Sequence, residues 1–111
     1  MNDFFDVDDL TVIKNTTGMQ LPVNYNLLNW KQKKQVREQY IKQQKNLCYY
    51  CKALLSSKPD DSMLKYPIHP HLYPPHFFKY PVHLHHHHDT GMTIGAVHNY
   101  CNAVLWEYHQ E

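Results

Sequence analysis

Two short motifs of metal-binding residues, far apart in the chain, constrain the fold more than any other feature. Cys48 and Cys51 form a Cys-x-x-Cys pair, and His98 and Cys101 form a His-x-x-Cys pair with the same spacing. With two residues between ligands, a tight turn or a first helical turn can direct both donors at one ion. Structural zinc takes four Cys or His ligands. The sequence therefore predicts a structural Zn²⁺ site made by Cys48, Cys51, His98 and Cys101.

The cysteine count and the composition agree with a metal-stabilised protein. The chain has 111 residues, of which 42% are apolar and three are cysteines. This length predicts one domain with a small core, which a metal crosslink would supplement. An odd number of cysteines argues against a disulfide framework, and a redox Cys-x-x-Cys would normally lie in a thioredoxin-like βαβ order that is missing here. No basic leader and no apolar run of about 20 residues is present, so we expect a reduced, cytoplasmic protein without a membrane segment.

Charge is distributed unevenly along the chain. The first ten residues contain four aspartates and no Lys or Arg, although the net charge of the whole chain is +1. Residues 1–24 show no clear periodicity, so we expect an acidic N-terminal arm followed by one domain over residues 25–111. Six of the 11 basic residues lie between Lys31 and Lys45. This cluster indicates polyanion binding, although a solvated helix face is the alternative interpretation.

Residues 29–45 are predicted to form a basic helix. Asn29 is a suitable N-cap and Asn46 a suitable stop. The apolar stripe consists of Trp30, Val36, Tyr40 and Ile41, with the methylene stem of Lys33 along its seam. Most basic residues of this helix lie outside the stripe. Those expected to bind phosphate groups are Lys31, Lys34, Arg37, Lys42 and Lys45.

The second half of the chain combines a proline-rich segment with a hairpin and a helix. Residues 66–81 hold five of the seven prolines, which excludes an α-helix or a central strand and predicts an extended, aromatic-rich wrap. Residues 82–88 and 92–97 are predicted as two strands joined by a turn at 89–91. The closing helix is predicted from Asn102, with Val104, Leu105 and Tyr108 as its apolar stripe.

Four consecutive histidines, His85 to His88, stand at the end of the first predicted strand, immediately before Asp89-Thr90-Gly91. Together with Cys48-Tyr49-Tyr50-Cys51 and His98-Asn99-Tyr100-Cys101-Asn102, this run resembles the motifs of the His-Me finger nucleases, the HNH class. It is most similar to the recombination endonuclease VII family of phages, over about residues 28–111. The resemblance implies an α+β fold with a zinc-stabilised ββα-metal domain.

The resemblance also implies an activity and a set of site residues. It implies a metal-dependent DNA endonuclease that leaves 5′-phosphate and 3′-hydroxyl ends. By position, His86 matches the general base, His85 and Asn102 match the ligands of a catalytic divalent metal, and His88 matches an accessory histidine. The catalytic metal would be Mg²⁺, Mn²⁺ or another divalent transition metal. His85 stands where Asp is frequent in the family, and imidazole favours borderline metals over hard Mg²⁺.

Several alternatives stay open at this level. The expected partner is DNA, and a phage protein partner is a further alternative. If the protein is phage-encoded, its location is the host-cell cytoplasm. The sequence leaves open whether it is a monomer or a homodimer. The competing function is a non-catalytic zinc-finger module that binds nucleic acid or protein; a histidine-rich metal store is a weaker third. No role is assigned to His69, His71, His76, His87 or His109. Adjacent residues of a flat strand face opposite sides, so a shared site for His85 and His86 requires a bulged or twisted strand end.

Overall fold

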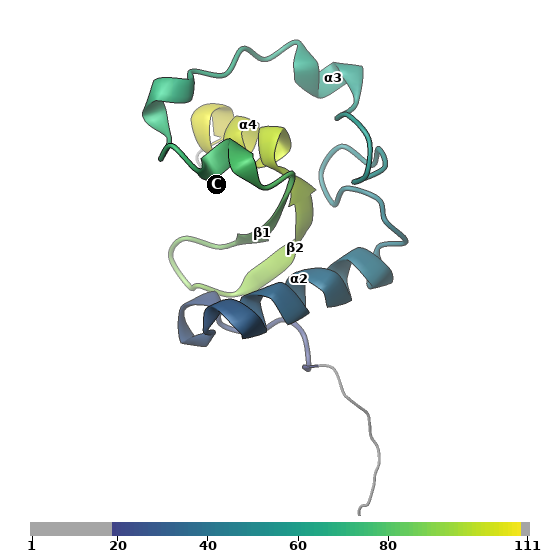
Figure 1. The fold of residues 1–111 in the computed structure, drawn as a ribbon, viewed down its shortest axis with the longest axis vertical. Coiled ribbons are helices and arrows are strands. Elements are labelled where there is room, and N and C mark those ends of the chain that lie inside the picture. The colour runs from purple at the N-terminus through teal and green to yellow at the C-terminus, as the bar shows by residue number, and fades with distance from the viewer. Residues whose placement is uncertain (1–18, 110–111) are drawn as a thin grey trace, which may run out of the picture.

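The computed structural model describes residues 19–109 as a small α+β fold, which confirms the predicted fold class at that level (Figure 1). A hairpin of two antiparallel strands, β1 (Val82–His86) and β2 (Thr93–His98), runs directly into helix α4 (Asn99–His109). Helix α2 (Trp30–Gln43) and α4 each contact both strands. Residues 1–18 of the predicted acidic arm lie outside the described residues, whereas Met19, Leu21 and Val23 pack against the core.

Helix α2 is defined by its two ends, as the sequence predicts. The Asn29 side chain accepts a hydrogen bond from the Gln32 backbone N–H, and the Gln32 side chain accepts one from the Asn29 backbone N–H, both at 2.9 Å. This reciprocal pair satisfies two backbone donors that a helix start otherwise leaves without partners. After the helix, Asn46 adopts a φ of 62° and its N–H bonds the Ile41 carbonyl at 2.8 Å, which ends the helix.

The buried face of α2 differs from the predicted stripe at one position. Val36 and Tyr40 are buried, but Trp30 is 73% exposed. At about 100° per residue, Trp30 lies about 120° from Val36 around the helix axis and within about 60° of Lys34 and Arg37. Trp30 therefore belongs to the cationic side of α2, and its inclusion in the apolar stripe was wrong.

The hairpin contains the irregularity that the histidine run requires. His85 pairs with Gly95, but the next residue, His86, pairs with Thr93, so that Ile94 is an extra residue on β2. An extra residue on one strand is a β-bulge, which bends the strand and re-aims its side chains. The expectation of a bulged strand end between His85 and His86 is confirmed.

The chain before η1 (Tyr25–Leu27) crosses the turn end of the hairpin. The Tyr25 backbone N–H bonds the Gly91 carbonyl at 2.8 Å, and the Thr93 N–H bonds the Val23 carbonyl at 2.9 Å. Gly91 has a φ of 80°, and a Cβ on it would lie 2.6 Å from the Asn24 side-chain oxygen. Glycine is thus required here both by backbone conformation and by the close approach of the preceding chain.

Helix α4 begins at Asn99, three residues earlier than the predicted start at Asn102. Cys101 consequently lies in its first turn rather than before it, together with Asn102. Val104 and Leu105 are buried as predicted, whereas Tyr108 is 39% exposed.

The proline-rich segment wraps around α4 (Figure 1). It follows the short helix α3 (Asp61–Leu64) and contains two single-turn 3₁₀ helices, η2 (Pro70–Leu72) and η3 (Phe77–Lys79). The Tyr73 hydroxyl donates to Glu107 Oε1 at 2.8 Å, and the His69 backbone N–H donates to the same oxygen at 3.0 Å. These bonds hold the wrap to α4, in agreement with the prediction of an ordered, mostly non-helical segment.

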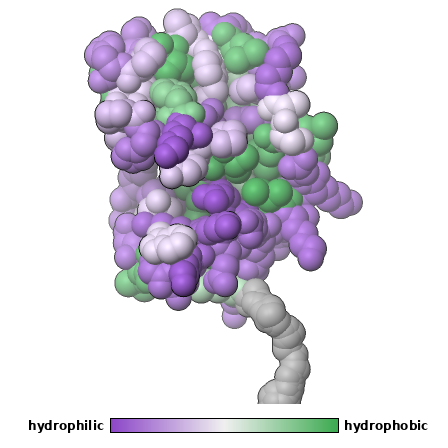
Figure 2. Space-filling model, viewed as in Figure 1, coloured by the Kyte–Doolittle hydropathy of each residue, from purple (hydrophilic) through white to green (hydrophobic). Residues whose placement is uncertain are grey.

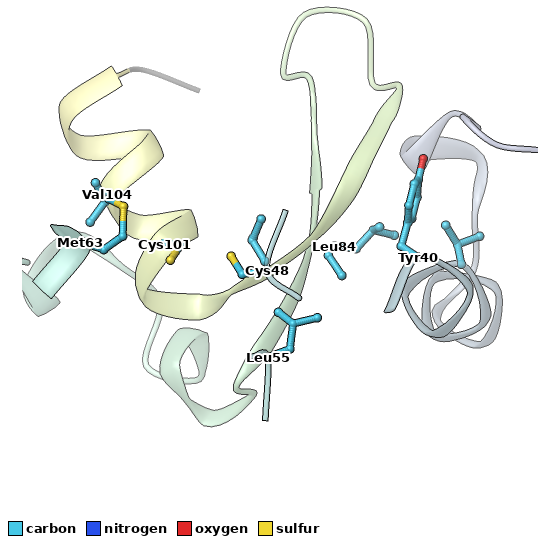
Figure 3. Packing of buried hydrophobic residues seen from close by; sticks show 10 residues of the cluster. Tyr40, Cys48, Leu55, Met63, Leu84, Cys101 and Val104 are labelled. Carbon is cyan, nitrogen blue, oxygen red and sulfur yellow. The ribbon is translucent and has the colours of Figure 1, made fainter. Parts of the chain in front are cut away.

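The core joins the hairpin to both main helices through the cysteines. Cys48 and Cys101 lie between Leu84 on one side and Met63 and Val104 on the other (Figure 3). The surface over α2 is mostly hydrophilic (Figure 2). Among the helices of the described residues, none is long and apolar enough to cross a membrane.

Candidate metal centre and histidine cavity

The structure brings the four predicted zinc ligands together. The ligand atoms of Cys48, Cys51, His98 and Cys101 all lie within 4.8 Å of one another. Cys48 and Cys101 are fully buried and His98 is 3% exposed. The ligands come from the turn after α2, the end of β2 and the first turn of α4, so an ion here would tie three elements of the fold together.

The orientation of His98 suits a metal ligand. Its Nε2–H donates to the backbone carbonyls of Leu54 and Ser57, at 2.8 and 3.0 Å. These acceptors fix the proton on Nε2, which leaves the Nδ1 lone pair directed at the sulfurs of Cys51 and Cys101, 3.4 and 3.6 Å away. Tetrahedral zinc with ordinary bond lengths separates its nitrogen and sulfur ligands by about 3.5 Å.

The Cys-x-x-Cys turn is shaped around the Cys48 sulfur. The backbone N–H groups of Tyr50 and Cys51 point at this sulfur from 3.4 and 3.5 Å, and Lys52 turns the chain back with a φ of 69°. A hydrogen bond from Cys101 lowers the pKa of Cys48 to about 4, and the same bond together with burial raises the pKa of Cys101. The donor set, its spacing and a sulfur held as thiolate all fit a structural Zn²⁺ ion.

A second candidate site is a cavity of about 640 Å³ between α2 and the proline-rich wrap. Its floor consists of hairpin and α4 residues, which include His83, His85, His86, His88 and Asn102. One wall consists of Trp30, Lys33, Lys34 and Arg37 from α2, and the other of Pro74, His76, Phe77 and Tyr80 from the wrap. The cavity therefore gathers all four residues to which the family resemblance assigns catalysis.

Asn102 is held in this cavity by a residue that the sequence analysis did not single out. The His83 Nε2–H donates to the Phe77 carbonyl at 2.9 Å, so His83 Nδ1 is an acceptor and receives the Asn102 amide N–H at 3.1 Å. Burial, assisted by the charge of Arg37, lowers the pKa of His83 and keeps the ring neutral. With its nitrogen so engaged, Asn102 can offer its side-chain oxygen to a ligand. The i, i+2 spacing of His83 and His85 along β1 was the available sequence signal.

His86 is oriented by stacking. The Tyr25 and His86 rings are stacked, with 3.9 Å between their centres and an interplanar angle of 5°. The Lys33 ammonium lies 4.2 Å from the centre of the Tyr25 ring. Burial lowers the pKa of His86 below its usual value, which favours the neutral imidazole at pH 7. Its Nδ1 is buried and has no hydrogen-bond partner among residues 19–109. No sequence pattern pointed to Tyr25.

The predicted phosphate-binding cations fall into two groups. Lys34 and Arg37 line the cavity, and Lys33, which is partly buried, lines it as well. Lys31, Lys42 and Lys45 do not line it. Within the described part of the chain, no carboxylate forms an ion pair with the cations of this wall. Their positive charge is therefore available to an anionic ligand.

Of the histidines without an assigned role, His76 lines the wrap wall of the cavity, and others lie elsewhere. His87 lines a smaller cavity on another part of the hairpin, with Thr93 and Ile94. His69 Nδ1 contacts Glu107 Oε2 at 2.8 Å, and His109 packs edge-on against Tyr50 and Tyr66.

Comparison of the chain with family models, with curated proteins and with solved structures gives no match. Functional inference consequently depends on the two sites themselves.

Proposed function

We propose that this protein is a metal-dependent DNA endonuclease of the His-Me finger kind, with a zinc-stabilised ββα-metal domain like that of the phage endonuclease VII family. The observation that supports it best is the convergence of His85, His86 and Asn102 on one cavity. Both histidines line this cavity, at the point where Ile94 interrupts the register of the hairpin. A binding module gains nothing from this arrangement.

In the proposed reaction His86 is the general base. It takes a proton from a water molecule, which attacks the phosphorus while the bond to the 3′ oxygen breaks; the departing 3′ oxygen takes up a proton from solvent water. This polarity gives 5′-phosphate and 3′-hydroxyl ends. The stacking of Tyr25 fixes the plane of the His86 ring, and burial keeps the ring neutral and able to accept the proton.

His85 and Asn102 are the residues that would hold a catalytic divalent cation. When bound, such a cation neutralises the scissile phosphate and the departing oxygen. His83 orients Asn102 through the 3.1 Å bond to its amide nitrogen, so that the amide oxygen is left for the cation. His88, 5.6 Å from His86 between ring centres, is a candidate for contact with the phosphate.

DNA is the proposed substrate because the cavity has a cationic wall. Lys33, Lys34 and Arg37 lie beside the histidines, without carboxylate partners in residues 19–109. Phosphate neutralisation by such residues makes binding strongly dependent on salt. Contacts of this kind position the backbone without reading the base sequence, so we expect low sequence specificity.

A plasmid-nicking assay with Mn²⁺ tests the proposal. The wild type is expected to nick, and His86→Ala to lose about a hundredfold or more in rate while it still binds DNA. His87→Ala is the matched control, because His87 is the next histidine of the run but lines a different cavity. Equal nicking by wild type and His86→Ala would refute the assignment of the base. No nicking by the wild type with any divalent metal would favour the non-catalytic zinc module.

The choice of metal gives a second test. An imidazole at position 85 favours Mn²⁺, Co²⁺ or Ni²⁺ over Mg²⁺. We expect nicking with each of these ions to be at least as fast as with Mg²⁺. A strict requirement for Mg²⁺ would contradict His85 as a ligand.

A further inference from the structure

The two walls of the histidine cavity differ in chemistry. The α2 wall carries the positive charges of Lys33, Lys34 and Arg37, whereas the wrap wall presents aromatic rings, including Tyr80, which is 53% exposed. The histidine floor described above joins them. A ligand that spans this cavity meets cations, aromatic faces and the proposed catalytic residues together.

Trp30 is the most exposed aromatic side chain of the cavity. It is 73% exposed, at the first residue of α2, and it lines the cavity on the same side of the helix as the cations. The Trp30 ring neither packs in the core nor caps the helix, so it is accessible to a ligand. Its position beside cations that have no carboxylate partners among the described residues indicates a ligand that combines a flat ring with a negative charge.

A nucleotide has this combination, but duplex DNA does not present it. In a duplex the faces of the bases are stacked on one another, and only edges and phosphates are accessible. Proteins that hold single strands combine a positively charged groove for the backbone with aromatic side chains on which bases stack. The cavity volume of about 640 Å³ lies in the range of pockets that enclose a small molecule. A volume in this range is compatible with an unpaired nucleotide.

We infer that the cavity is a subsite for single-stranded DNA, in which an unpaired base stacks on Trp30 while Lys34 and Arg37 hold its phosphates. The occupant is thus a single-stranded or frayed stretch of DNA next to the phosphate that is cut. This inference rests on the proposed function for its role in catalysis, but the binding that it requires can be measured separately.

Base-dependent binding is the test. A short fluorescent dT oligonucleotide and an abasic oligonucleotide of equal length carry the same backbone charge and differ in the bases. With the full zinc-loaded chain and no other divalent metal, we expect dT to bind about tenfold tighter than the abasic strand, as stacking of one base predicts. Trp30→Ala is expected to bring this ratio close to one, with little change in the affinity for the abasic strand. Equal affinity of the wild type for both strands would overturn the inference.

The second tryptophan supplies the controls. The chain has two tryptophans, and Trp106 is also exposed, at 44%, but does not line the cavity. Trp106→Ala is expected to keep the tenfold ratio. Trp106→Phe leaves Trp30 as the sole tryptophan, whose fluorescence is expected to be quenched by dT and not by the abasic strand. Unchanged Trp30 fluorescence with bound dT would contradict stacking.

Failure of this inference can be told apart from failure of the proposed function. If the wild type discriminates dT from the abasic strand but never nicks, the nuclease proposal fails and the subsite stands. If the wild type nicks plasmid but binds both strands equally, the subsite fails and the nuclease proposal stands.

Discussion

The Cys/His centre and the histidine cavity both use imidazoles from one hairpin, yet their surroundings differ in every respect that decides function. His98 at the end of β2 is buried, and its ring is fixed by two backbone carbonyls and faces three sulfurs. His86 at the end of β1 is partly exposed and lines an open cavity beside cations. The same side chain thus faces a possible metal site in one place and an open, cationic cavity in the other.

The two sites differ in the contact that orients each imidazole ring from the side away from the site. His98 and His83 each donate Nε2–H to backbone carbonyls, which fixes which nitrogen faces the site. His86 is held by ring stacking instead, and its buried Nδ1 has no hydrogen-bond partner in the part of the chain that the structure describes. A ligand histidine needs a fixed lone pair, whereas a base must be able to take up a proton.

Loss of the Cys/His centre is expected to have the largest effect. Cys101→Ser removes one thiolate from a fully buried site, and zinc binding in such sites contributes directly to folding. We expect zinc content to fall well below one equivalent and the free energy of unfolding to drop by about 5 kcal/mol or more. Metal analysis and urea denaturation measure both. His86→Ala is the control and should keep its zinc and its stability. Full zinc occupancy in Cys101→Ser would show that the four residues do not act as one site.

Loss of the ring that orients Asn102 is expected to have a smaller effect, confined to the cavity. His83→Ala removes the acceptor of the Asn102 amide N–H. Removing a group that orients a metal ligand typically costs 10- to 100-fold in metal affinity. The Mn²⁺ concentration for half-maximal nicking should rise by about that factor, with zinc content unchanged. An unchanged Mn²⁺ requirement would mean that His83 does not act through Asn102.

Exchanging one candidate ligand in each site tests whether the histidine cavity and the Cys/His centre bind different metals. His85→Asp introduces a carboxylate, which favours Mg²⁺, so the ratio of Mg²⁺- to Mn²⁺-supported nicking should rise about tenfold. His98→Cys is the counterpart in the other centre, and it should keep its zinc, because structural sites accept either donor. For both variants, the measurements are the nicking rate with Mg²⁺ and with Mn²⁺ and the zinc content. A shift of metal preference caused by His98→Cys would contradict the separation of the two sites.

The smallest effect is expected at Tyr25. Tyr25→Leu removes the ring that stacks on His86, and such a contact is worth about 0.5–1.5 kcal/mol. Nicking should slow by about 3- to 10-fold with zinc content and DNA affinity unchanged. Tyr25→Phe keeps the ring and should restore the rate. A Phe variant as slow as the Leu variant would assign the effect to the hydroxyl instead.

Local patterns were sufficient to predict part of the fold. The ends of α2 follow from Asn29 and Asn46, because capping depends on a few neighbouring residues. The members of the Cys/His centre follow from spacing alone. The start of α4 was missed because the segment from Asn99 to Cys101 was taken to precede the helix, whereas it belongs to the first turn.

The remaining features depend on tertiary contacts. The stacking of Tyr25 on His86 exists because the chain before α2 pairs with the hairpin at Gly91, and no local signal encodes that pairing. Trp30 was assigned to the core because it is apolar at roughly helical spacing, yet its true direction follows from which side of α2 meets the sheet. His83 could have been inferred from alternation along β1, but its bond to Asn102 could not.

The extra residue in β2 makes the two sites genetically separable. An in-frame loss of the Ile94 codon would remove the register shift opposite His85 and His86. The stretch from Gly95 to Cys101 would keep its own spacing, and with it the metal-binding corner. On the proposed function, a single-codon lesion of this kind would separate metal binding from nicking.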